Sequence, residues 1–180
     1  RKQKTTMTCD KAFYKEADNQ YVLEVVGNIN VQQKDKIISA EKGIYNEEDD
    51  LFKLEEAISI KMTNLGWMVD DETKSDINND DINQTFNQET EITCDKLSFK
   101  GDVKELILLG NIVLKQDDKV IKANKMMFDD NAGKLHCYGD VEMIKDGKDT
   151  IKSNYLEVDL KNEIFLAKDN VSSQYHLKKN

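Results

Sequence analysis

The chain has 180 residues, no proline and a formal net charge of −9 at pH 7. This length suffices for one domain with a sizeable hydrophobic core, whereas the acidic balance argues against nucleic-acid binding, which needs a basic stripe. No apolar run is long enough for a transmembrane helix. No segment repeats apolar residues at i, i+3, i+4 and i+7 over three turns, so we expect strands rather than long helices. The chain begins at Arg1 rather than methionine, so we expect a signal peptide or an N-terminal anchor to be absent from it.

One pattern of apolar, small and turn residues occurs five times along the chain. Each copy is counted from a small residue, called its origin, and places apolar residues at offsets −2, +3, +5, +12, +14, +18 and +20. Offset +16 is a glycine in three copies. In the first copy a two-residue insertion displaces the second half. The origins, in chain order, are Cys9, Ala40, Cys94, Ala123 and Ser153.

Each copy is predicted to be a bent strand, a turn and a second bent strand. Apolar residues at every second position are typical of a strand that is buried on one face. The step from the origin to +3 breaks this period, which indicates a bulge or bend. Gly27, Gly110 and Gly139 lie inside the second apolar run, where glycine marks a kink or a close backbone approach. Glu56 and Asp169 stand in the same slot of the second and fifth copies.

An insertion of about 24 residues separates the second copy from the third. It lies within residues 63–90, where the apolar alternation stops and Asp, Asn, Gln and Thr dominate. Such a composition cannot bury enough apolar surface to become ordered, so we predict a disordered acidic loop. Asp76, Asn78 and Asp80 copy the first ligands of a calcium loop, but Asp81 and Asn87 replace the required glycine and closing glutamate. We therefore expect no metal site there.

The stacked copies predict an all-β fold, and the whole chain, residues 1–180, is expected to form a single domain. Inward side chains of successive copies would align into columns and form a long apolar interior. That interior is either a closed sandwich core about 10 Å thick or a trough that stays open to acyl chains. The residues that would line such a lipid-binding trough are Ile38, Tyr45, Leu54, Ile92, Phe99, Leu108, Ile112, Ile121, Met126, Phe128, Leu135 and Val141.

The cysteines and histidines do not indicate catalysis. Cys9, Cys94 and Cys137 all fall in apolar slots of the repeat, so they are interpreted as small core residues, although a disulfide between two of them stays open. His136 and Cys137 are adjacent in a strand and would point to opposite faces, so they cannot act as base and nucleophile together. Without a recognised catalytic or phosphate-binding motif, we expect no enzyme, no catalytic residue and no cofactor.

The two ends of the stack are predicted to be open. Terminal repeats normally carry polar caps, and edge strands are normally blunted, for example by proline. Here the first copy is complete and the fifth is weakened only at Ser173. Such ends favour the addition of a strand from another chain. The charges of Lys178 and Lys179 in the tail would weakly oppose this strand addition.

The repeat resembles that of the OstA-like family of lipopolysaccharide-transport proteins. The resemblance lies in the sequence segments 27–33, 110–116 and 139–141, each followed by a strand with small residues, such as 38–42 or 121–125. It covers all five copies of the repeat. The family includes the periplasmic bridge protein LptA, its membrane-anchored relative LptC and the N-terminal domain of LptD. The resemblance implies a twisted, incomplete β-jellyroll that holds lipid acyl chains, with jellyrolls joined end to end across the periplasm.

The resemblance thus implies a periplasmic protein that binds lipopolysaccharide or a related acylated lipid and bridges the two membranes. The implied partners are other OstA-like jellyrolls, or further copies of this chain, joined near residues 7–14 and 165–173. Two alternatives stay open. One is a membrane-anchored, LptC-like component of the same pathway, and the other is a structural repeat protein that polymerises through its edge strands.

Overall fold

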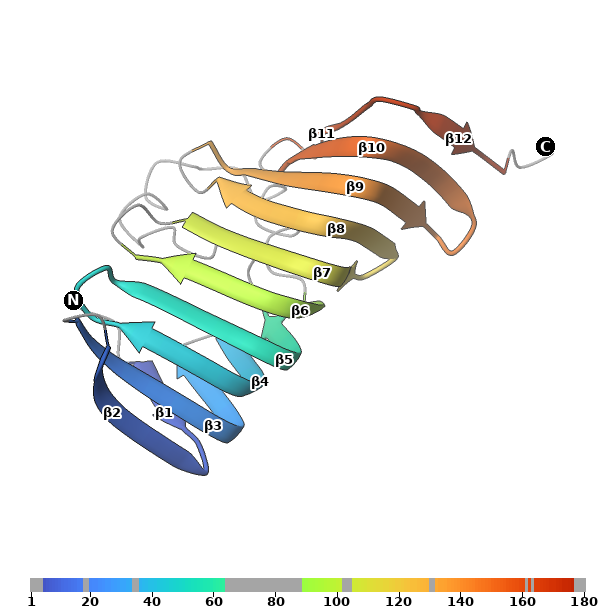
Figure 1. Ribbon diagram of the computed structural model, residues 1–180. Coiled ribbons are helices and arrows are strands. Elements are labelled where there is room, and N and C mark those ends of the chain that lie inside the picture. The colour runs from blue at the N-terminus through green and yellow to red at the C-terminus, as the bar shows by residue number, and fades with distance from the viewer. Residues whose placement is uncertain are drawn as a thin grey trace, which may run out of the picture.

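The structure is a computed structural model that describes residues 5–17, 20–33, 36–63, 89–101, 105–129, 132–160, 162 and 164–176. The predicted acidic loop, with its calcium-like motif, and the tail lysines lie outside these ranges. The described residues form β-strands joined by turns and contain no helix, so the predicted all-β class is confirmed (Figure 1). Within them, no helix is long and apolar enough to cross a membrane.

Twelve strands form one antiparallel sheet in which neighbours in sequence are mostly neighbours in space (Figure 1). The sheet order is β1-β3-β4-β5-β6-β7-β8-β9-β10-β11, while β2 also pairs with β3 and β12 with β10. The strands are β1 (Thr5–Thr8), β2 (Lys11–Ala17), β3 (Gln20–Gln33), β4 (Lys36–Asn46), β5 (Leu51–Met62), β6 (Thr90–Lys100), β7 (Glu105–Gln116), β8 (Lys119–Asp129), β9 (Lys134–Lys145), β10 (Asp149–Asp159), β11 (Ile164–Lys168) and β12 (Ser172–Gln174).

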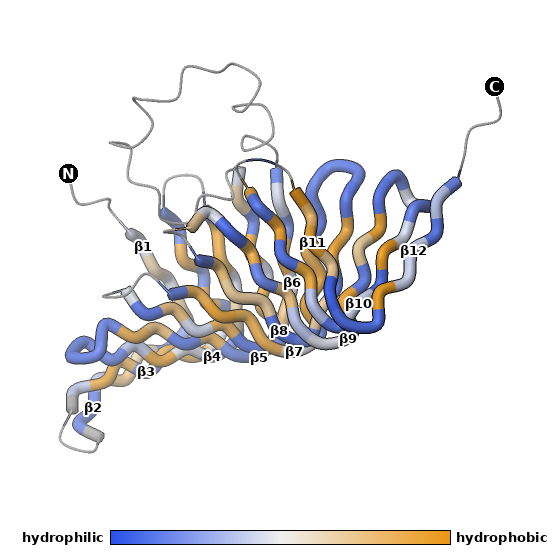
Figure 2. Tube along the Cα trace, turned by 90° about the horizontal axis from the view of Figure 1, so that it is seen from above, coloured by the Kyte–Doolittle hydropathy of each residue, from blue (hydrophilic) through white to orange (hydrophobic). Residues whose placement is uncertain are grey.

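A bend runs across the sheet and divides it into two limbs. Limb A contains β2, β11 and the halves of β3 to β10 that pair between them, whereas limb B contains β1, β12 and the other halves. Figure 2 shows β1 and β2 lying apart on the two limbs at one end of the sheet. Because the end strands are interrupted at the bend and the two edges do not meet, the jellyroll is incomplete, as the family resemblance implies.

The bend arises in the second strand of each repeat copy. There, two residues of that strand face one residue of the neighbouring strand. Between Val26 and Ile29, for example, Gly27 and Asn28 face the single residue Glu41 of β4. Both have positive φ, 79° and 46°, which is the left-handed region where glycine and asparagine are least strained. The extra residue increases the local twist and bends the strand. The bulge predicted from the break in periodicity is thus confirmed.

All five copies keep this bend, including the two that lack glycine. In the second copy Glu56 and Ala57 have φ of 65° and 52°, and in the fifth copy Asp169 and Asn170 have φ of 61° and 57°. Asp and Asn tolerate this region because their short side chains can bond locally. Glu56 and Ala57 have no such advantage, so the packing on either side imposes the bend in the second copy.

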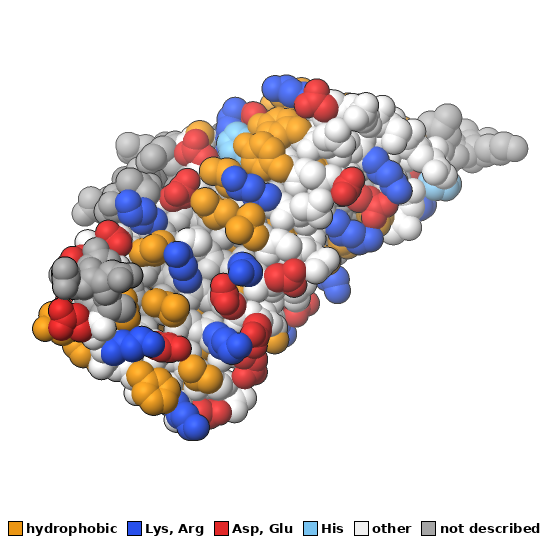
Figure 3. Space-filling model, in the orientation of Figure 1, with side chains coloured by type: hydrophobic (Ala, Val, Ile, Leu, Met, Phe, Trp, Pro, Cys, Tyr) orange, Lys and Arg blue, Asp and Glu red, His pale blue; other side chains and the backbone are white. Residues whose placement is uncertain are grey.

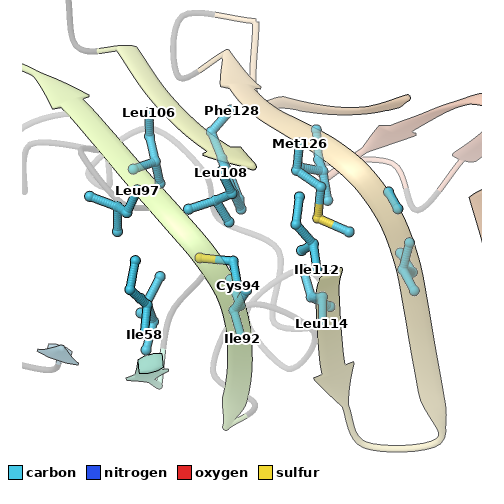
Figure 4. Close-up of a cluster of buried hydrophobic side chains, with 14 of the residues drawn as sticks. Ile58, Ile92, Cys94, Leu97, Leu106, Leu108, Ile112, Leu114, Met126 and Phe128 are labelled. Atoms are coloured by element: carbon cyan, nitrogen blue, oxygen red, sulfur yellow. The ribbon is translucent and has the colours of Figure 1, made fainter. Parts of the chain in front are cut away.

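The core lies between the limbs and is a single cluster of side chains from both. In Figure 4 the labelled side chains of β5 to β8 point into one shared interior. Leu97 and Leu108 come from limb A, while Ile92 and Leu114 come from limb B, and all four are at most 2% exposed. Alternate residues of every strand face this interior, as the period-two pattern predicts.

Candidate functional site

All twelve residues proposed from the sequence as lipid-lining lie on the interior face of the sheet. Ten of them are buried, and Tyr45 and Phe99 are partly exposed. Seven belong to limb A and five to limb B, so the two limbs contribute to one surface. The limb A residues are Tyr45, Leu54, Phe99, Leu108, Met126, Phe128 and Leu135, and the limb B residues are Ile38, Ile92, Ile112, Ile121 and Val141. Their role in lipid binding stays a prediction.

The centre of the interior is filled by its own side chains. Leu54, Ile60, Leu106 and Met126 are each 0% exposed. Of the two alternatives left open by the sequence, the structure therefore has the closed packing in its central part. A hydrocarbon chain can reach these residues only if the limbs move apart and the chain takes the place of contacts across the interior.

The interior becomes accessible toward β2. Tyr14 and Tyr21 face inward at this end but are 64% and 52% exposed, and their rings stack with centroids 5.5 Å apart. Next to them Leu23 is only partly buried. Aromatic side chains continue inward along limb A through Tyr45 and Phe52, which are paired across β4 and β5. This end thus exposes a continuous inward-facing apolar surface. Sequence reasoning placed Tyr14 in this row but missed Tyr21, because the insertion in the first copy puts Tyr21 outside the template.

The rim of limb B is polar, which the sequence analysis did not foresee. Lys36, Thr90 and Gln116 occupy inward positions of one row on β4, β6 and β7, with Met62 of β5 between Lys36 and Thr90, and are at most 7% exposed. They extend the apolar column of limb B by one step toward the loops. The signal was present in the sequence, since each lies two residues beyond an apolar slot of the repeat. The interior therefore has an aromatic rim on limb A and a polar rim on limb B.

The three cysteines are free thiols that pack as small apolar residues. Cys94 and Cys137 are 6% and 0% exposed, and burial raises the pKa of each thiol to about 12. A thiol with so high a pKa is protonated at neutral pH and is a poor nucleophile. Cys9 lies at the interruption between β1 and β2 and is partly exposed. The disulfide left open by the sequence is absent, and the interpretation as core residues is confirmed for Cys94 and Cys137.

His136 lies on the outer face, opposite to Cys137, as the strand period predicts. Its Nδ1 is 2.8 Å from the Tyr155 hydroxyl, which donates a hydrogen bond of 3.1 Å to Glu157. Glu157 also accepts a bond from Lys134. Burial and the Glu157 carboxylate raise the pKa of Tyr155 to about 12. These groups are paired with each other on the convex surface, where Figure 3 shows hydrophobic side chains interspersed with charged ones.

Two cavities of moderate size open elsewhere on the surface. One of about 410 Å³ is lined by Glu89, Glu91, Lys115 and Asp117. The other, of about 380 Å³, lies at the bend beside Ala57, where no long side chain fills the space next to Asp95 and Asn111. Among the described residues no group of three or more His, Cys, Asp or Glu side chains is placed to hold a metal ion. Neither cavity is a long apolar trough.

Both edges of the sheet offer unpaired backbone on one side. Among the described strands, β1 and β2 pair only with β3 at one end, and β11 and β12 pair only with β10 at the other. Their inward residues are less buried than those of the central strands: Met7, Cys9, Phe165 and Ala167 are partly exposed, and Val171 is 53% exposed. The described edge strands carry no proline, so what opposes strand addition there is charge, such as Glu16, which faces inward opposite Tyr21, and the outward Lys11 and Lys168.

Seventeen chains of solved structures match this chain. One is described as the crystal structure of LptH, the LptA homologous periplasmic component of the conserved lipopolysaccharide transport device from Pseudomonas aeruginosa. It has 9% sequence identity to this chain over 98% of each chain, with a TM-score of 0.39. No family model and no curated protein sequence matches. Similarity at this level concerns the fold alone, so function is inferred below from the geometry of the chain itself.

Proposed function

We propose that this chain is a periplasmic lipid carrier that holds the acyl chains of lipopolysaccharide or a related glycolipid between its two limbs. The observation that carries the proposal is the apolar interior, which runs through every copy of the repeat and becomes accessible beside Tyr14 and Tyr21. The periplasmic location and the choice of a glycolipid follow the resemblance of the repeat to the OstA-like family. The role is binding and transfer rather than chemistry.

The binding energy would come from apolar contact. Each methylene removed from water contributes about 0.8 kcal/mol, so an acyl chain of a dozen carbons supplies on the order of 10 kcal/mol before ordering costs. Separating the limbs exposes side chains such as Leu108 and Ile112, which are 0% and 1% exposed. The same acyl chain covers them again, so much of the cost of opening is recovered on binding.

A photo-crosslinking experiment tests the lipid site. A photoreactive residue at Phe128, which faces the interior and is 5% exposed, should label lipopolysaccharide. The matched control is Met127, the preceding residue of β8, which points to the outer face. A photoreactive residue there should not label lipopolysaccharide. The core oligosaccharide without acyl chains should compete poorly at position 128. Phe128→Arg, which places a charge in the interior, should abolish labelling from a second inward position such as Leu135. Equal labelling at positions 127 and 128 would refute an interior site.

Transfer over a distance would need jellyrolls joined end to end, and the repeat specifies how two copies would align. Inside the chain, slots +12, +14, +18 and +20 of one copy face slots +5, +3, 0 and −2 of the next, for example Phe52 with Phe99 and Ile58 with Cys94. If β11 and β12 of one molecule continue this register onto β2 and β1 of another, the facing pairs are Phe165–Tyr14, Ala167–Ala12, Val171–Cys9 and Ser173–Met7.

A disulfide tests this joint. Val171→Cys should crosslink to the native Cys9 of a second molecule, because directly opposed residues of antiparallel strands have Cα atoms about 4.5–5.5 Å apart. Ser172→Cys, one residue further and facing outward, is the negative control. Ile58→Cys, refolded under oxidising conditions, is the positive control, since Ile58 and Cys94 form the same slot pair inside one chain. Crosslinking from Ser172→Cys as fast as from Val171→Cys would exclude the proposed register.

A second candidate is a structural repeat protein that polymerises through the same edges without carrying lipid. The closed packing of the central interior favours it, because a core at 0% exposure is already complete without a ligand. Native mass spectrometry of a delipidated sample with added lipopolysaccharide separates the two. A stoichiometric lipid adduct supports the carrier, whereas joint formation without any adduct supports the structural role.

A further inference from the structure

We propose that Lys11 and Lys168 select the partner at the end-to-end joint. They disfavour a second copy of this chain and favour a related jellyroll whose last strand carries a carboxylate opposite Lys11. This inference rests on the joint proposed above and concerns which chain completes it.

The repeat register brings the two lysines together on the outer face. Inside the chain, slot +15 of one copy always faces slot +2 of the next. The four facing pairs are Val26–Lys42, Glu55–Lys96, Leu109–Lys125 and Tyr138–Tyr155. Lys168 is slot +15 of the fifth copy, and Lys11 is slot +2 of the first. In a joint between two identical chains, the same register places Lys168 directly opposite Lys11.

None of the four internal pairs opposes two like charges. The Glu55–Lys96 pair forms a salt bridge of 3.1 Å between Oε1 and Nζ, and the others combine a lysine with an apolar residue or two tyrosines. Like charges that are directly opposed across two strands are destabilising, whereas opposite charges are stabilising. The self-joint would therefore be the one junction in the stack with the unfavourable pair, and Glu55–Lys96 shows the combination that suits this position.

The nearest carboxylates in the joint are Asp10, which accepts a hydrogen bond from Asn28, and Asp169; each adjoins one of the two lysines, and the same register brings the two carboxylates together at the bend. The other outward pairs in limb A of the joint would be Leu166 with Phe13 and Ile164 with Lys15. On the strands next to the joint, Glu24 is already paired with Lys15 and Glu157 with Lys134. The Lys168 ammonium lies 5.5 Å from the ring centroid of Tyr155, its cross-strand partner on β10, so it must leave this contact to reach a side chain on the strand that the partner would add.

A charge-swap cycle tests the inference through self-association, in which a second copy of the same variant stands in for the related jellyroll. Self-association is measured by sedimentation for the wild type, Lys11→Glu, Lys168→Glu and the double variant. Each single swap creates one opposite-charge pair and should tighten association about three- to tenfold. The double variant restores like charges and should return close to the wild type. Thermal unfolding of each variant confirms that all four chains fold equally.

Salt provides the second readout. Association of the wild type should strengthen as salt rises from about 0.01 M to about 1 M, where the screening length falls from about 30 Å to about 3 Å. The net charge is −9 for the wild type and −9 − 2 = −11 for each single swap, so salt also screens a general repulsion; the single swaps should gain less from added salt than the wild type, because salt weakens their opposite-charge pair. If the single swaps associate no more tightly than the wild type while the Val171→Cys crosslink to Cys9 still forms, this inference is wrong and the joint stands. If Val171→Cys gives no crosslink to Cys9, either alone or combined with each single swap, the joint itself is refuted.

Discussion

The bend of the second copy should be the most easily improved part of the fold. Glu56 and Ala57 occupy the left-handed pair position that is Gly-Asn in two other copies and Gly-Asp in a third. A residue other than Gly, Asn or Asp costs about 1–2 kcal/mol in this region. Ala57→Asn removes part of that cost without adding the unfolded-state freedom that glycine would bring. We expect it to raise the free energy of unfolding by about 1 kcal/mol.

The reverse substitution at an equivalent position gives the matched control. Asn111 has φ of 45°, and its side-chain amide donates a hydrogen bond of 2.8 Å to Asp95. Asn111→Ala introduces the strain and removes that bond. Because the bond is exposed to solvent, most of the expected loss, about 1–2 kcal/mol, comes from the backbone.

Thermal unfolding followed by circular dichroism measures both variants. In a chain of this size about 1 kcal/mol shifts the Tm by about 2–4 °C, so Ala57→Asn should melt a few degrees above the wild type and Asn111→Ala a few degrees below it. Ala57→Gly serves as a further variant, with a smaller gain because of the unfolded-state entropy of glycine. A lower Tm for Ala57→Asn, or no change for Asn111→Ala, would show that the positive φ values carry no strain.

Three further substitutions probe the interior and the outer face. Leu108→Ala removes a side chain that is 0% exposed and should cost about 2–5 kcal/mol in urea unfolding; a smaller loss would mean a loosely packed core. Gly43→Ala should also destabilise, by about 1–3 kcal/mol, because its added Cβ would lie 2.8 Å from the Leu54 side chain. Two lysine hydrogen bonds lower the pKa of Glu142 below 4.5. Its contribution is therefore complete above pH 4.5 and lost as pH falls through the lowered pKa, so Glu142→Gln should reduce stability slightly at pH 7, and this loss should shrink as the pH is lowered below 4.5.

The strand pattern and the inward residues were predictable because they depend on local rules. Period-two alternation and the break after each origin predicted bent strand pairs, and all twelve proposed lining residues lie on the interior face. The bend in the second copy was harder to foresee, since Glu56 is a poor residue for positive φ. There the pairing of β5 with β4 and β6 on either side overrides the local preference, which no single-residue rule contains.

The state of the interior could not be predicted from the sequence. Whether limb A residues such as Leu54 and limb B residues such as Ile60 stay apart or pack together depends on the distance between the limbs, and alternation in the sequence is the same in either case. The polar rim at Lys36, Thr90 and Gln116 escaped notice for a related reason. Each is a polar residue and would ordinarily be assigned to the solvent face, although its position two residues beyond an apolar slot of the repeat already puts it on the inward face.

The topology also indicates how the closed interior could admit a lipid. Every ladder of backbone hydrogen bonds joins neighbouring strands within limb A or within limb B, with the register interrupted at the bend. Moving the limbs apart therefore breaks side-chain contacts across the interior but no strand pairing. Hydrogen exchange measures this directly: on addition of lipopolysaccharide, amides of β6 to β9 should keep their protection, since the ladders persist. Faster exchange along one ladder would mean that lipid enters by separating two strands, and then the bend would not be the place where the molecule opens.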